Sequence, residues 1–262
     1  MYILKRWVGA LVLTIAAVGV NSMPASAANI FLTGDANISD ALAGGQTVTN
    51  PDNERFFRNL LQGATGVSVL NTGVQFVPAP TQIASYYNTV PGVTATLFSG
   101  TVTAADLAGR QLFVSAVPDD AFTGAELSVL TTFVAGGGNI LFLGENNNSD
   151  FTVGNAAINS ALAALGSSLA IVVDLFDSGY NFASGAQIAV DPFTAGVTRF
   201  TYAASSSVSG GTPILFGSGG QPFFAYESSG GTTGVIPVPA SLPLFVAGFA
   251  VLAFARRRFR TH

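Results

Sequence analysis

Residues 127–145 read LSVLTTFVAGGGNILFLGE, and this stretch decides the fold class. Apolar residues recur at three- and four-residue spacing before the glycines, which predicts a helix over residues 123–135. Thr123 is expected to cap this helix, with Glu126 completing a capping box. Three glycines then end the helix, and the apolar run at residues 139–144 predicts a buried strand.

The same alternation of helix and strand extends in both directions. Apolar runs predict further strands at residues 29–34, 67–70, 93–98, 111–115 and 169–173. Helices are predicted at residues 52–61 (with Asp52 as N-cap), 84–88 and 153–165. Beyond these, shorter spacing predicts turn-linked strands at residues 187–190, 197–203, 213–216 and 223–226. We therefore expect one α/β domain over residues 28–227, with a mostly parallel sheet, helices on both faces and a β-rich C-terminal portion.

Residues 127–145 resemble class I glutamine amidotransferase-like domains, which have a flavodoxin-like fold. Catalytic members of that family carry a Cys after the corresponding strand, with His and Glu partners later in the chain. Here Gly144 and Glu145 follow the strand, the chain contains no Cys, and its only His is His262. The resemblance therefore implies the fold and a loss or absence of amidotransferase chemistry.

The composition excludes several classes of function. Without Cys, and with one His at the last position, the chain has no thiol nucleophile, no Ser-His-Asp triad and no zinc site built from thiolates or imidazoles. All fourteen acidic residues but only four basic ones lie between Asp35 and Glu227, which gives this region a net charge of about −10. Such a surface repels phosphate backbones, so no nucleic-acid partner is expected. We expect a non-enzymatic protein.

The N-terminal segment, residues 1–27, has the three parts of a secretory signal peptide. Lys5 and Arg6 precede an apolar run at residues 7–20, and Ala25 and Ala27 form a small-x-small cleavage site. We expect the Sec translocon and signal peptidase to act on this segment and to leave a mature chain that begins at Ala28 or Asn29.

The C-terminal segment has the sequence pattern of a membrane helix. A spacer of Gly, Ser and Thr at residues 228–235 precedes residues 236–262, IPVPASLPLFVAGFAVLAFARRRFRTH. The uncharged run at residues 242–255 predicts a membrane helix of about 21 Å, shorter than a hydrocarbon core of about 30 Å. The cluster that follows it, Arg256, Arg257 and Arg258, is expected on the cytoplasmic side of the inner membrane, with the acidic domain outside.

This tail is similar to the PEP-CTERM sorting signal of exported proteins in Gram-negative bacteria. The similarity rests on a proline motif, an apolar helix and an arginine cluster in that order, with the motif comprising Pro237, Val238, Pro239, Ala240 and Ser241. Val238 stands where the family has Glu. The resemblance implies that the protein is an exosortase substrate: held by inner-membrane lipid, then processed and released to the cell surface or an exopolysaccharide matrix. The alternative is a plain C-terminal membrane anchor.

Four carboxylates follow predicted strands, namely Asp35, Asp119, Asp120 and Glu145. In a doubly wound sheet, ligands bind beyond the carboxyl ends of the strands, so these residues form the candidate ligand or cation cluster. Oxygen ligands without imidazole suit Ca²⁺, and two facing carboxylates suit glycoside chemistry. Asp is also common in turns and at helix N-termini. We expect no cofactor or metal; a calcium-dependent binding module and a carboxylate-based glycan-active enzyme remain alternatives, and extracellular polysaccharide is a candidate partner.

Overall fold

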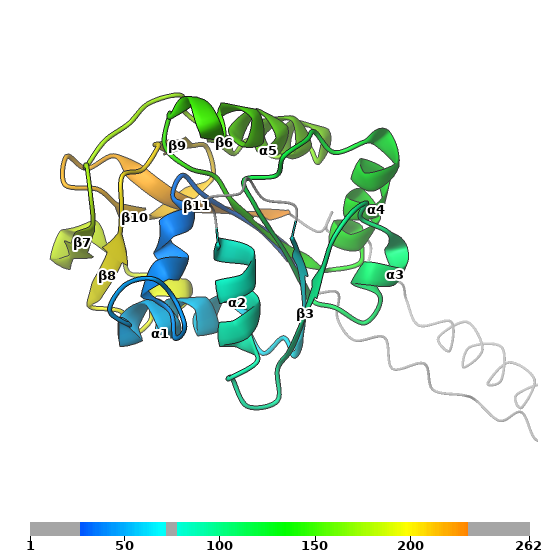
Figure 1. Cartoon of the computed structure of the whole chain (residues 1–262), viewed down its shortest axis with the longest axis horizontal. Helices are drawn as coiled ribbons and strands as arrows, with labels where there is room; N and C mark the ends of the chain where they lie inside the picture. Colours follow the sequence, from blue (N-terminus) through cyan, green and yellow to red (C-terminus); the bar gives the residue numbers. More distant parts are fainter. Residues whose placement is uncertain (1–26, 72–77, 230–262) are drawn as a thin grey trace, which may run out of the picture.

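A computed structural model of the chain describes residues 27–71 and 78–229. Its centre is a seven-stranded sheet in the order β10-β11-β1-β5-β4-β2-β3 (Figure 1). The strands are β1 Ala28–Thr33, β2 Gly66–Leu70, β3 Thr94–Phe98, β4 Leu112–Ala116, β5 Asn139–Leu143, β10 Thr212–Phe216 and β11 Pro222–Ser229. Strands β1 to β5 run parallel to one another, whereas β11 is antiparallel to both β1 and β10. The predicted α/β class and mostly parallel sheet are confirmed.

Helices cover both faces of this sheet. The helices are α1 Pro51–Leu60, α2 Ala79–Tyr87, α3 Ala104–Leu107, α4 Gly124–Ala135 and α5 Thr152–Ala164. Helices α1 and α2 pack on one face around Phe31, Phe56 and Phe57, and α3, α4 and α5 pack on the other around Phe113 and Phe142 (Figure 1). Because both faces are buried, the central strands are apolar at nearly every position.

The helix N-termini follow the sequence signals in one case and depart from them in another. Helix α4 begins after Thr123, which forms the predicted capping box with Glu126. The assignment of Asp52 as N-cap of α1 is wrong. Asn50 caps that helix and accepts a 2.9 Å hydrogen bond from the backbone N–H of Asp52. Pro51 takes the first helical position, where its lack of an N–H costs nothing.

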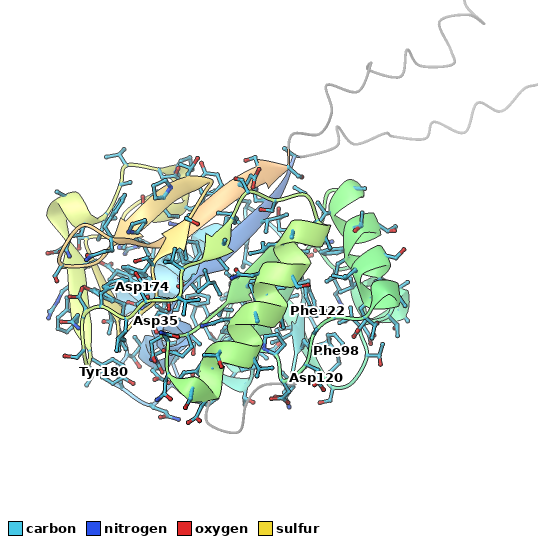
Figure 2. The ribbon with its side chains drawn as sticks, turned by 90° about the horizontal axis from the view of Figure 1, so that it is seen from above. Asp35, Phe98, Asp120, Phe122, Asp174 and Tyr180 are labelled. Carbon is cyan, nitrogen blue, oxygen red and sulfur yellow. The ribbon has the colours of Figure 1, made fainter. Side chains whose placement is uncertain are left out.

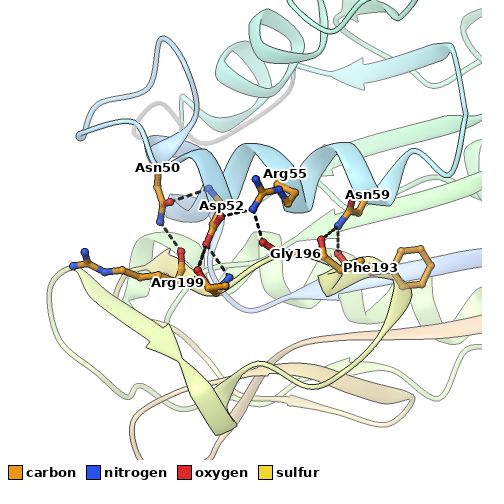
Figure 3. A network of polar contacts seen from close by, with 9 residues as sticks. Asn50, Asp52, Arg55, Asn59, Phe193, Gly196 and Arg199 are labelled. Atoms are coloured by element: carbon orange, nitrogen blue, oxygen red, sulfur yellow. Dashed lines mark hydrogen bonds and ion pairs between the residues drawn. The ribbon is translucent and has the colours of Figure 1, made fainter.

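The Asp52 side chain instead fastens α1 to a distant loop (Figure 3). Its Oδ2 accepts hydrogen bonds from the backbone N–H and hydroxyl of Thr198, both at 2.8 Å, and from the N–H of Arg199 at 2.9 Å. About two turns further along α1, the Asn59 amide donates to the carbonyl of Phe193 at 3.0 Å. Helix α1 is thereby clasped to the segment that leads into strand β8, Arg199–Tyr202.

The C-terminal portion differs from the prediction in how its strands pair. The predicted strand at residues 169–173 shrinks to β6 Ala170–Ile171, which pairs with β9 Val208–Ser209 outside the main sheet. Residues 187–190 are not a strand, because a 3-10 helix, η3 Gly185–Gln187, leads into a single bridge at Ile188. The partner of β8 is β7, Asn181–Ser184, which the polar sequence there did not predict.

Two helices, α2 and α3, are longer or more numerous than the sequence predicted. The predicted short helix at residues 84–88 is the end of α2, which starts at Ala79 because Pro80 is tolerated in a first turn. Helix α3 was not predicted, since its four residues are too few to show periodicity. The remaining 3-10 helices are η1 Ala36–Ala41, η2 Ser149–Phe151 and η4 Pro192–Thr194.

Candidate functional site

The chain reverses its winding direction between strands β1 and β5. These strands are parallel neighbours, yet the chain leaves β1 toward α1 on one face and leaves β5 toward α5 on the other. Such a topological switch point opens a crevice at the carboxyl ends of the strands. Asp35 lies two residues after β1, and Glu145 lies two residues after β5. The sheet therefore brings these two predicted site residues to one place.

Asp35 is completely buried, with 0% of its surface exposed. Its Oδ1 accepts a 2.8 Å hydrogen bond from the backbone N–H of Asn37, and Asp35 thereby caps the N-terminus of the 3-10 helix η1. Its Oδ2 accepts a 2.6 Å hydrogen bond from the N–H of Ala203, in the segment after β8. The carboxyl group thus joins the first strand of the sheet to its C-terminal portion.

Glu145 is equally enclosed, at 1% exposed, and both of its oxygens are occupied. Its Oε2 accepts hydrogen bonds from the Asn37 side-chain amide at 2.8 Å and from the Ala36 N–H at 3.3 Å. Its Oε1 accepts hydrogen bonds from the backbone N–H of Asn146 at 2.9 Å and from its side-chain amide at 2.6 Å. Asn37 therefore links the two acids, because its backbone serves Asp35 and its side chain serves Glu145.

Burial makes this pair hold protons more tightly than ordinary carboxyl groups. Desolvation raises the pKa of Asp35 to about 7, against the hydrogen bonds from Ala203 and Asn37, and the charge of Asp40 adds to the rise. Desolvation followed by the charge of Asp35 raises the pKa of Glu145 to about 8. Two carboxylates in one dry site cannot both ionise at low cost, so the pair retains a proton near neutral pH.

Asp40 and Tyr180 close the site from outside, and the sequence prediction included neither. The Tyr180 hydroxyl donates to Asp40 Oδ2 at 2.6 Å, and the Gln82 amide donates to Asp40 Oδ1 at 2.7 Å. Burial of the hydroxyl, then Asp40, raises the pKa of Tyr180. Tyr180 lies 140 positions from Asp40, so no local sequence signal could have revealed the contact.

Asp119 and Asp120 do not belong to this site. They follow β4 and line a separate open hollow of about 320 Å³, with Leu70, Thr101, Pro118 and Phe122 among its other walls. Asp35 and Asp120 are well apart, with helix α5 between them in the view of Figure 2. Desolvation and the charge of Asp120 raise the pKa of Asp119. The predicted cluster of four acids is therefore two separate pairs: Asp35 and Glu145 are buried, whereas Asp119 and Asp120 are exposed.

The other acidic loops that follow strands serve structural roles. Asp174 accepts hydrogen bonds from the N–H and hydroxyl of Ser207 at 2.7 and 2.6 Å. Asp177 accepts a 2.5 Å hydrogen bond from the Tyr202 hydroxyl and another from the Ser218 hydroxyl. Among the residues that the structure describes, no three acidic or His side chains converge as metal ligands.

Comparison with known proteins shows little. No protein-family model matches the chain, and no curated protein matches it in sequence. Among solved structures, it is similar to the "mmIFT52 N-terminal domain", at 20% sequence identity and a TM-score of 0.42. That match covers 58% of this chain and 76% of the other.

Most of the predicted sorting residues lie outside the described part of the chain. These are Ala25, Pro237, Val238, Pro239, Ala240, Ser241, Arg256, Arg257 and Arg258. Ala27 is described and is exposed, immediately before the buried Ala28 that begins β1. Within residues 27–71 and 78–229, no helix has both the length and the apolar character needed to cross a bilayer.

Proposed function

We propose that this chain is a non-enzymatic exported protein whose α/β domain is carried across the inner membrane, held there by the C-terminal tail and then released by processing. The destination would be the cell surface or an extracellular polysaccharide matrix. The tail would act as a membrane helix over residues 242–255, and the resemblance of its proline motif to the PEP-CTERM signal makes an exosortase-type enzyme the expected processing partner.

The observation that carries this proposal is the position of the two ends of the folded domain. The first residue of β1, Ala28, is paired directly with the last residue of β11, Ser229. The first and last strands of the described domain thus begin and end side by side, and the predicted leader and tail would join the domain there. Removal of the leader after Ala27 would leave β1 whole, and cleavage in the tail would leave β11 whole.

The burial of Glu145 favours a non-enzymatic role over glycan hydrolysis. A carboxylate pair that cleaves glycosides must face substrate across an open cleft. Glu145 is enclosed, and both of its oxygens already accept hydrogen bonds from the protein. Asp119, another acid of the predicted cluster, instead lines the open hollow. These two acids would therefore not work together on one substrate.

Intact mass spectrometry of the protein released by cells that carry an exosortase tests the proposal. The expected product begins at Ala28 or Asn29 and ends near Pro239 or Ser241. A variant in which Arg256, Arg257 and Arg258 are all changed to Ser should lose processing, while Arg110→Ser, at a half-buried arginine of the folded domain, serves as the control. A released protein that still contains Arg256 would reject processing. Full-length protein found in the cytoplasm would reject export.

A further inference from the structure

The two edges of the seven-stranded sheet are closed in different ways. Main chain covers the outer side of β10, where Ile188 forms a bridge with Leu215. The Ala189 N–H also donates a 3.0 Å hydrogen bond to the Ile214 carbonyl there. Strand β3, at the opposite edge, pairs with β2, and no strand of the described residues pairs with its other side (Figure 1). Such an edge presents main-chain donors and acceptors with which another chain can pair.

The composition of β3 favours pairing of this kind. Residues 94–98 read TATLF, a run with β-branched and aromatic residues but without charge or proline. Thr94, Thr96 and Leu97 are exposed. Because copies of one chain carry identical edges, the nearest available partner for an open β3 is the β3 strand of a second copy.

Alternate residues of β3 turn their main chain away from β2. The Thr94 N–H donates a 2.8 Å hydrogen bond to the Thr65 carbonyl at the start of β2, so Thr94 faces β2. Successive residues of a strand direct their N–H and C=O groups to opposite sides. Ala95 and Leu97 therefore present their main-chain groups to the outer edge of the sheet.

The side chain of Asn88 occupies the first of these two outward positions. Asn88 is the C-cap residue of helix α2. Its Oδ1 accepts a 2.9 Å hydrogen bond from the Ala95 N–H, and its Nδ2 donates a 3.0 Å hydrogen bond to the Ala95 carbonyl. A carboxamide carries the same donor and acceptor as a peptide unit. Asn88 thus pairs with Ala95 in the place that a neighbouring strand would take.

Antiparallel pairing of two copies depends on Ala95. A two-fold axis through Thr96 would place Ala95 of each copy opposite Leu97 of the other, and each pair would exchange two main-chain hydrogen bonds. All four of these bonds involve Ala95, whose N–H and carbonyl are already bound to Asn88. A register centred on Leu97 would retain only the two bonds between the Leu97 residues. The Asn88 contact therefore removes the most extensive pairing that this short strand can form.

Arg110 adds a charge beside the same part of β3. Its guanidinium donates a 2.8 Å hydrogen bond to Thr96 Oγ1. Two copies paired about Thr96 would bring two guanidinium groups together, and like charges opposite each other destabilise a strand pair. Charged side chains are a common protection of edge strands. Arg110 leaves the main chain of Ala95 untouched, so the direct block of the edge rests on Asn88.

We propose that the Asn88 carboxamide blocks the β3 edge against antiparallel pairing with β3 of a second copy of this chain. Removal of the carboxamide frees the N–H and the carbonyl of Ala95. The bonds between β3 and β2 stay in place, because they lie on the other side of the strand. This role goes beyond the proposed export, since it would keep copies of the domain apart wherever the chain is concentrated.

A single introduced cysteine tests the proposal, because the chain contains no Cys of its own. The two copies of Thr96 would form a non-hydrogen-bonded pair with Cα atoms about 4.5 Å apart, a separation that a disulfide spans. The full chain carrying Thr96→Cys is oxidised with copper phenanthroline and analysed on a non-reducing SDS gel. We expect a monomer from Thr96→Cys alone and a disulfide-linked dimer from Asn88→Ala/Thr96→Cys. Four restored main-chain bonds should raise the dimer yield by about ten-fold or more.

Two further variants separate strand pairing from general unfolding. Ala125→Cys, at an exposed position of α4, should give the same low dimer yield with Asn88 or with Asn88→Ala. Leu97→Pro removes an outward N–H, which edge strands tolerate, and should lower the dimer yield of Asn88→Ala/Thr96→Cys.

A dimer yield at Thr96→Cys that does not change with Asn88→Ala would overturn the proposal. An equal rise at Ala125→Cys would also overturn it, because the association would then not be specific to β3. The gel reports on contacts between purified chains, so neither outcome depends on whether the tail is processed.

Discussion

Ala28 and Ser229 are 201 positions apart in the chain and lie directly opposite each other in strands β1 and β11. The Ser229 hydroxyl donates a 3.0 Å hydrogen bond to the Ala28 carbonyl. Strand β1 therefore has β5 on one side and the last strand of the domain on the other. The centre of the sheet is incomplete until the final eight residues of the domain are in place.

We predict that a variant ending at residue 221 does not fold, whereas a variant ending at Ser229 does. The shorter chain lacks β11 and with it Phe223 and Phe224, both fully buried. Loss of one buried Phe side chain costs about 3–5 kcal/mol, and typical domains have only about 5–15 kcal/mol in total. Urea unfolding followed by circular dichroism should give a cooperative transition for the longer variant alone. A cooperative transition for the shorter variant would show that β11 is dispensable.

Gly34→Ala should destabilise the domain strongly. The chain passes so close to Ser206 that an added Cβ at Gly34 would lie 1.9 Å from the Ser206 carbonyl oxygen. Because backbone must move to relieve this contact, we expect a loss of about 2–4 kcal/mol in the free energy of unfolding. Gly124→Ala is the matched control, since no atom lies within 4 Å of a Cβ placed there. Equal urea midpoints for the two variants would contradict the close approach.

The stability of the domain should depend on pH through Asp35 and Glu145. Their folded-state pKa values, about 7 and about 8, are raised from ordinary values of 3.8 and 4.5. Between the unfolded and folded pKa values, the folded state binds more protons than the unfolded chain. The stabilisation that the pair contributes is therefore fully present below about pH 4 and is lost as pH rises through 8. Each pKa unit between the folded and unfolded states corresponds to about 1.4 kcal/mol in the free energy of unfolding.

The measurement for this prediction is the free energy of unfolding from urea titrations at pH 5, 7 and 9. Glu145→Gln should flatten the decline between pH 5 and 9, because it removes one of the two titrating groups. The slope is the relevant readout, since the amide also changes the hydrogen bonds at this position. Glu54→Gln should keep the wild-type slope. A Glu145→Gln slope as steep as that of the wild type would show that the pair does not hold the proton.

Asp52→Asn should loosen the clasp between α1 and the loop before β8. Although burial opposes it, hydrogen bonds from Thr198 and Arg199 together with the Arg55 guanidinium lower the pKa of Asp52. The ionised carboxylate is therefore the form that the fold binds, and its replacement should cost about 1–2 kcal/mol. Asp120→Asn, which changes a carboxylate without a partner, should leave stability within about 0.5 kcal/mol. If thermal unfolding shows the same stability for Asp52→Asn as for the wild type, these hydrogen bonds contribute little to stability.

The fold class and most strands of the sheet could be predicted from local sequence patterns. Residues 123–145 predicted helix α4, its Thr123 cap and strand β5, because these depend on short-range rules: periodicity, capping and glycine stops. Strands that are apolar at every position can lie only in a sheet covered on both faces, which set the layered architecture. Where local signals were weak, as at β7 and α3, the prediction failed.

Which of the predicted acids share a site depends on contacts between distant parts of the chain. Position after a strand was the same sequence signal for Asp35, Asp119, Asp120 and Glu145, but the fold buries the first and last together and leaves the other two exposed in the loop after β4. Strand order and burial arise from contacts between residues far apart in the chain, such as the N–H of Ala203 on Asp35. Local patterns contain no record of such contacts. For that reason the sequence could supply the candidate acids, while the fold alone determined that one pair is enclosed and the other faces solvent.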